Sequence, residues 1–124
     1  MEVLAEQVFT GKWRSFKIFK RLGDILLHSE KRFREFNFMC DRGLIIKEFE
    51  GAREQMLVNT DKWSISFQKK KHFLNILIPK IVFEVITVNH TVLVLLDVEQ
   101  GDKIFLAREQ QWLHYLKLNH TVVI

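Results

Sequence analysis

Short runs of alternating apolar and polar residues fill almost the whole chain, and turn residues separate them. In one run Trp63, Ile65 and Phe67 share a parity, and in another Phe36 and Phe38 do. Such alternation with a period of two is typical of a strand that buries one face. We therefore predict that these side chains point into a common interior.

The same pattern along the chain predicts about eight or nine strands joined by short connections. They occupy residues 12–20, 34–40, 44–50, 53–58, 62–68, 73–78, 80–88, 91–98 and 103–110. Successive short strands are typical of an antiparallel up-and-down meander, and closure of the sheet removes its exposed edges. The predicted fold is therefore all-β, a single antiparallel up-and-down β-barrel of about eight strands.

The N-terminal third contains two irregular places. Trp13 and Ile18 lie in one run but have opposite parity, which a β-bulge soon after Trp13 would reconcile. Residues 22–31 then form the longest interruption, where Asp24 is suited to cap a short helical turn carrying residues 25–27. We expect a short helical or irregular segment between the first two strands, with a plain packed loop as the alternative.

Length and composition limit the number of domains. The chain has 124 residues, 48% of them hydrophobic, with eleven Phe and three Trp. This is enough for one core and too little for two ordinary domains, so residues 1–124 are predicted to form a single domain. Lys80, Glu84 and Asn89 interrupt the most apolar region, so no membrane span is predicted.

Cysteine content and charge bear on the compartment and on partners. Cys40 is the only cysteine, which excludes an intramolecular disulfide and a cysteine-based metal site. Residues 1–6 lack the pattern of a secretory signal, so a cytoplasmic location is predicted. The net charge of +4 is modest, and the basic stretch 69–72 is typical of a solvated hairpin turn, so no nucleic-acid partner is expected.

Three residues near the two ends of the chain suggest a family. Gly11 and Trp13 form a Gly-x-Trp motif at the head of the first strand, and Arg108 lies in the last strand. This arrangement resembles the opening of the small lipocalin-like proteins of the calycin superfamily. The resemblance implies a structural barrel closure in which the indole of Trp13 plugs the floor of the barrel, Arg108 lies across it, and Gly11 permits a tight turn.

The resemblance also implies a function. Residues 62–65 and 83–95 are similar to the mid-chain strand and the penultimate hairpin of these proteins. About ten residues between the first two strands cannot hold the helix-turn-helix of the fatty-acid-binding proteins, which argues against a close member of that branch. The expected activity is non-catalytic binding of a small hydrophobic, lipid-like ligand inside the barrel.

Inward parity gives the residues expected to line that site. They are Arg34, Phe36, Phe38, Trp63, Ile65, Phe67, Phe83 and Val85. Arg34 shares the parity of Phe36 and is placed to meet an acidic ligand head through a forked pair of hydrogen bonds. The alternative is that Arg34 is a cross-strand partner for a neighbouring glutamate.

Two other classes of function stay open. The same aromatic side chains can fill the interior, which would leave a structural or protein-interaction module without a ligand. A calycin-type enzyme or haem binder comes third, because the histidines lack ligand spacing and no catalytic motif is present. Glu48, Glu50 and Glu54 lie close together, but acids that flank a turn are usually solvated. We therefore predict no enzyme activity, no metal site and no cofactor.

The outer wall of the barrel suggests a partner. If Leu74, Ile76 and Ile78 point inward on one strand, and Val92, Val94 and Leu96 on another, an apolar patch remains outside. Its members are Phe73, Leu77, Val82, Ile86, Leu93 and Leu95. Monomeric proteins rarely expose such a patch. Either a second copy covers it as a homodimer interface, or the tail 112–124 folds over it.

Overall fold

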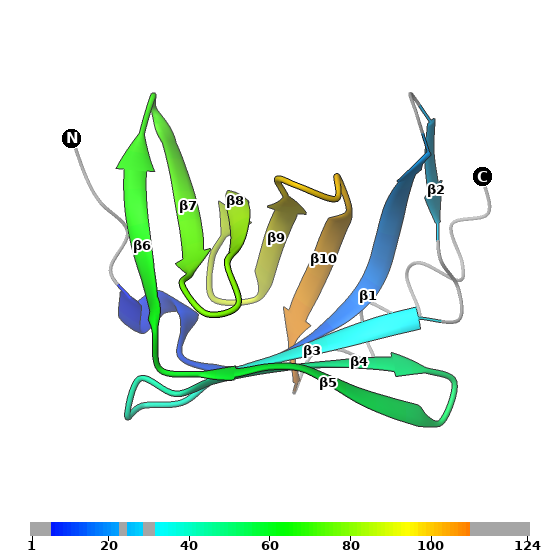
Figure 1. Ribbon diagram of the computed structural model, residues 1–124, viewed down its shortest axis with the longest axis horizontal. Helices are drawn as coiled ribbons and strands as arrows, with labels where there is room; N and C mark the ends of the chain where they lie inside the picture. Colours follow the sequence, from blue (N-terminus) through cyan, green and yellow to red (C-terminus); the bar gives the residue numbers. More distant parts are fainter. Residues whose placement is uncertain (1–5, 23–24, 29–31, 110–124) are drawn as a thin grey trace.

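The computed structural model describes residues 6–22, 25–28 and 32–109, and these form an all-β antiparallel structure (Figure 1). A short 3-10 helix, η1 (Glu6–Phe9), precedes the strands. The strands of the described ranges are β1 (Gly11–Leu22), β2 (Ile25–His28), β3 (Arg32–Phe38), β4 (Leu44–Glu50), β5 (Arg53–Thr60), β6 (Trp63–Gln68), β7 (Lys71–Ile76), β8 (Ile81–Val88), β9 (Val92–Asp97) and β10 (Lys103–Arg108). No helix within these ranges is long and apolar enough to cross a membrane.

The strands form one sheet in the order β5-β4-β3-β1-β10-β9-β8-β7-β6, with β2 paired to β1 beside this path. Figure 1 shows the sheet curled into a half-barrel, with β3, β4 and β5 along the bottom and β6–β7 facing β1–β2 across the open side. The antiparallel up-and-down sheet is confirmed. The prediction of about eight strands is corrected to nine on the path, and β5 and β6 are its two ends. Alternation along the sequence identifies the strands. It does not show whether the two end strands of the sheet pair with each other and close a barrel.

The segment between the first two predicted strands is extended. Residues Ile25–His28 form β2, which pairs with the distal part of β1 from Phe19 to Leu22. The predicted helical turn over residues 25–27 is therefore wrong, and Asp24 lies outside the described residues. Pairing between β1 and β3 ends at Arg14, so the rest of β1 needs another partner on that side, and β2 supplies it.

A β-bulge in β1 brings side chains of opposite parity to the same face. The pairing of β1 with β10 shifts register between Ser15 and Lys17. Trp13 and Ile18 are both buried in the core cluster as a result. The bulge predicted shortly after Trp13 is thus confirmed, and β1 bends away from β3 at this point.

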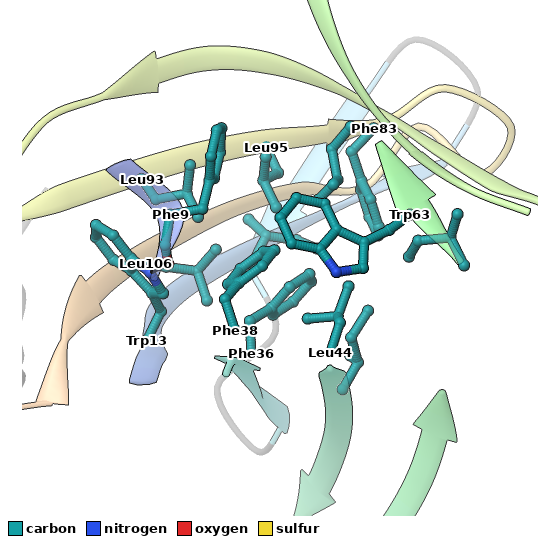
Figure 2. Packing of buried hydrophobic residues seen from close by; sticks show 14 of the residues in the cluster. Phe9, Trp13, Phe36, Phe38, Leu44, Trp63, Phe83, Leu93, Leu95 and Leu106 are labelled. Carbon is teal, nitrogen blue, oxygen red and sulfur yellow. Dashed lines mark hydrogen bonds between the residues drawn. The ribbon is translucent and has the colours of Figure 1, made fainter. Parts of the chain in front are cut away.

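The core fills one end of the half-barrel, which we call the floor. Figure 2 shows Phe36 and Phe38 between Trp13 on one side and Trp63 on the other. Phe36 lies edge-on to Phe83 with 5.6 Å between ring centroids, and Phe38 meets Trp63 at 5.2 Å. The Trp13 indole nitrogen donates a hydrogen bond of 2.8 Å to the carbonyl oxygen of Phe9 in η1. These contacts leave the floor occupied by the protein's own rings.

The orientation predicted for β9 is reversed. Leu93 and Leu95 are fully buried in the core cluster, whereas Val94 lies outside that cluster. Leu93 pairs with Leu106 and Leu95 with Ile104, which are core residues of β10. Residues 92–96 are all apolar, so alternation contains no polar position to fix their phase. The pairing with β10 fixes it instead.

The predicted outer patch is therefore smaller than expected. Phe73 and Val82 are half-buried on neighbouring strands, while Leu77 and Ile86 are exposed. With Leu93 and Leu95 in the core, the six residues do not form one continuous surface. Ile78, which was predicted to point inward, lies beyond the end of β7 with 72% of its surface exposed. Residues 112–124 lie outside the described residues, and the homodimer stays a prediction.

Candidate functional site

The floor is held at its outer side by Arg108. Its guanidinium carbon lies 4.2 Å from the centre of the Trp13 ring. Its nitrogens donate hydrogen bonds to three backbone carbonyl oxygens, those of Val8 at 3.0 Å, Thr10 at 2.6 Å and His90 at 2.7 Å. Burial lowers the pKa of Arg108 from its ordinary value, which is high enough that the group stays charged at neutral pH. Arg108 thereby links η1, the start of β1 and the turn between β8 and β9.

Gly11 leaves room for this guanidinium. Its φ angle is +123°, a backbone conformation that residues other than glycine rarely adopt. A Cβ atom at this position would lie 2.6 Å from Nη1 of Arg108. The structure thus brings Gly11, Trp13 and Arg108 together, as the resemblance implied.

A second pair of tryptophan and arginine, Trp63 and Arg42, lies on the opposite side of the floor, and no pattern in the sequence predicted it. The Trp63 indole donates to the carbonyl oxygen of Arg42 at 2.8 Å, and Arg42 donates back to the Trp63 carbonyl at 2.7 Å. Arg42 also forms an ion pair with Glu6 at 2.9 Å. Beside this pair is a small recess of about 190 Å³. Its lining residues are Glu6, Gln7, Thr10, Met39, Cys40, Arg42 and Trp63.

The eight residues predicted to line a ligand site fall into two groups. Phe36, Phe38, Trp63 and Phe83 are almost completely buried against one another in the floor. They therefore occupy space that the sequence assigned to a ligand. The other four residues, Arg34, Ile65, Phe67 and Val85, occupy the next inward positions along β3, β6 and β8.

Beyond the floor, the part of the concave face on β6, β7 and β8 carries three apolar side chains and one histidine. Ile65 packs against the core cluster, and Phe67 is half-buried with its ring 4.6 Å from that of His72. Val85 is 9% exposed and lies at the edge of the core cluster. His72 pairs in register with both Phe67 and Val85, so it lies between them on this face. We call Ile65, Phe67 and Val85 the apolar wall.

Another part of the concave face, on β3 and β4, is charged. Beyond Phe36 and Ile46 the inward positions carry Arg34, which pairs in register with Glu48, and Arg32, which pairs with Glu50. Both Arg34 and Arg32 donate to the same Glu48 oxygen, Oε1, and the Arg34 distance is 3.2 Å. Arg34 therefore takes the cross-strand partner that was the alternative to a ligand acid.

A further carboxylate completes this group from the turn after β9. Asp102 Oδ2 lies 3.6 Å from Nη2 of Arg34. The side chains of Arg34, Glu48 and Asp102 are 11%, 13% and 6% exposed, whereas that of Arg32 is 24% exposed. We call Arg32, Arg34, Glu48 and Asp102 the charged cluster. Its formal charges sum to zero.

The bend in β1 helps to position the charged cluster. Ser15, at the edge of the bulge, accepts a hydrogen bond of 2.8 Å from the backbone N–H of Arg34. The carbonyl oxygen of Asp102 accepts the N–H of Asp97 at 2.8 Å, which fixes the turn that carries its carboxylate. In the part of the chain that the structure describes, no buried side-chain nitrogen or oxygen lacks a hydrogen-bond partner.

The acidity of Glu48 provides a prediction for this cluster. Burial on its own raises the pKa of Glu48, but the hydrogen bonds and charges of Arg32 and Arg34 outweigh burial and lower the pKa below its ordinary value of 4.5. A depressed folded-state pKa stabilises the protein above the ordinary value, and this stability is lost as the pH falls through the folded-state value.

We therefore expect the free energy of unfolding of the wild type to decrease as the pH is lowered below 4.5. In Glu48→Gln, which lacks this carboxylate, the decrease over the same pH range should be less steep. Urea unfolding of both proteins at a series of pH values measures the two slopes. Equal slopes below pH 4.5 would contradict the assignment of Glu48 as a paired carboxylate.

No metal site is assembled in residues 6–22, 25–28 and 32–109, where no three His, Cys, Asp or Glu side chains are placed to hold an ion. Comparisons of the chain with protein-family models, with curated proteins and with solved structures gave no match. The arrangement of charged and apolar side chains is therefore the basis for a functional proposal.

Proposed function

We propose that this protein binds a small hydrophobic molecule on its concave face and does not change it chemically. The observation that carries the proposal is the division of the concave face beyond the floor, where an apolar wall lies on β6 and β8 and a charged cluster lies on β3, β4 and the turn after β9. A ligand pocket typically combines apolar lining with a few well-placed polar groups. The body of the ligand would lie along Ile65, Phe67 and Val85, and its polar end would lie toward Arg32.

The family resemblance supports the same proposal. The Gly-x-Trp motif and the contact of Arg108 with Trp13 are in keeping with a lipocalin-like, calycin-type protein. Proteins of this kind hold ligands in the mouth of a barrel. The filled floor moves the proposed position of the ligand toward the open side, beyond Phe36 and Phe83.

Titration with the neutral fluorescent probe N-phenyl-naphthylamine tests this function. We expect saturable binding to the wild type and a loss of affinity of about tenfold in Phe67→Ala, because the substitution removes a large apolar surface from the wall. Phe73→Ala is the matched control, since Phe73 pairs with Ser66 on the other face of the same hairpin. Equal losses in the two variants, or no binding to the wild type, would contradict the proposal.

The second candidate is a structural or protein-interaction module with a filled interior. The close packing of Phe36, Phe38, Trp63 and Phe83 favours it. Absence of probe binding in the titration above supports this candidate, since a filled interior has no site for the probe.

A further inference from the structure

We propose that the concave face selects a hydrophobic ligand with a neutral polar head, such as an alcohol, ester or amide, over a free acid, and that Glu48 sets this selection. The inference rests on the proposed function and adds the class of ligand. It departs from the expectation that Arg34 neutralises an acidic head.

Both arginines of the charged cluster already have carboxylate partners. Arg34 lies between Glu48 and Asp102, and Arg32 donates to the same Glu48 oxygen. With two cations and two anions, the charged cluster carries no formal excess charge to attract an acid. A ligand carboxylate would either displace Glu48 or lie beside it as a like charge.

The cost of removing charges from water also opposes the binding of an acid at the charged cluster. Glu48 and Asp102 are 13% and 6% exposed, so a displaced carboxylate would stay in a poorly hydrated place without its partner. Leaving a buried charge unpaired is strongly unfavourable. A ligand acid would also lose its own hydration on entering the site.

A neutral head avoids both costs. Arg32 is the most exposed member of the charged cluster, and a guanidinium carries five N–H donors in a planar fork. A hydroxyl or carbonyl oxygen can accept one of these donors while Glu48 keeps its place. Glu48 thus acts as a built-in counter-ion that disfavours an anionic head.

Position along β4 makes Glu48 suited to this role. The inward residue before it, Ile46, is buried in the core cluster, and the inward residue after it, Glu50, is exposed. Glu48 therefore stands between the buried core and the exposed end of β4. Glu54, on the neighbouring strand β5, pairs instead with Lys47 at 3.0 Å and belongs to the convex face.

The test compares dodecanol with dodecanoic acid as competitors of N-phenyl-naphthylamine at neutral pH. Within each protein, the ratio of the two inhibition constants reports head-group selection. We expect dodecanol to compete better in the wild type and Glu48→Gln to move the ratio toward the acid by about tenfold or more. The matched control Glu54→Gln should leave the ratio unchanged.

If Glu48→Gln folds poorly, two other variants test the same selection. Asp102→Asn removes the other carboxylate and should move the ratio in the same direction. The double variant Arg32→Gln, Glu48→Gln restores the charge balance and should return the ratio toward the wild-type value.

The outcomes separate this inference from the proposed function. If dodecanol binds but neither Glu48→Gln nor Asp102→Asn moves the ratio, or if the wild type prefers the acid, the inference about Glu48 is wrong and the binding function stands. If neither the probe nor dodecanol binds the wild type, the proposed function fails, and the inference fails with it.

Discussion

Replacing Trp13 by alanine is expected to lower the free energy of unfolding by about 3 to 5 kcal/mol. Trp13 is fully buried, its indole nitrogen is hydrogen-bonded to η1, and its ring carries the Arg108 guanidinium. The substitution leaves a cavity in the floor and removes the surface on which Arg108 stacks. Chemical denaturation followed by circular dichroism measures the change.

Leu77→Ala serves as the control for this experiment. Leu77 is 59% exposed in the link between β7 and β8, so its truncation should change stability by less than about 0.5 kcal/mol. If the unfolding midpoint of Trp13→Ala equals that of the wild type, the assignment of Trp13 to the floor is wrong.

The second large effect is expected for Arg34→Met, which should cost about 2 to 4 kcal/mol. Methionine keeps much of the side-chain volume but removes the partner of both Glu48 and Asp102, which are nearly buried. Two neighbouring carboxylates would then face each other with only Arg32 to balance them. Urea denaturation at neutral pH gives the change in free energy.

A convex-face lysine provides the comparison. Lys47 forms an ion pair with Glu54 at 3.0 Å, and the side chains of the two residues are 31% and 50% exposed. Ion pairs that water can reach contribute little, so Lys47→Met should cost less than about 1 kcal/mol. Equal costs for the two substitutions would show that the charged cluster does not stabilise the concave face more than an ordinary surface pair.

Most strands and the faces that they bury could be predicted from the sequence, because the alternation of apolar and polar residues follows the alternation of buried and exposed positions. It predicted the inward positions of Phe36, Phe38 and Trp63, and it required the bulge in β1. It could not orient β9, since a run without polar residues has no phase. It also missed β2, whose pairing follows from the length of β1 rather than from its own composition.

Part of the charged cluster could have been predicted from the sequence. Tight turning at residues 41–43 sets the register in which Phe38 faces Leu44, and the same register places Arg34 opposite Glu48. Treating Glu48 as a solvated acid ignored this cross-strand relation. Asp102 joins the cluster from a distant turn, so its contact with Arg34 follows only from the curvature of the sheet.

A backbone amide NMR titration with dodecanol tests the central claim, that the concave face beyond the floor binds a hydrophobic molecule, most directly. We expect the largest shift changes at inward positions of β3, β4, β6 and β8, close to Arg34, Glu48, Phe67 and Val85, with little change around Phe73. Changes confined to the convex face or to the recess beside Arg42 and Trp63, or no changes at all, would contradict the claim.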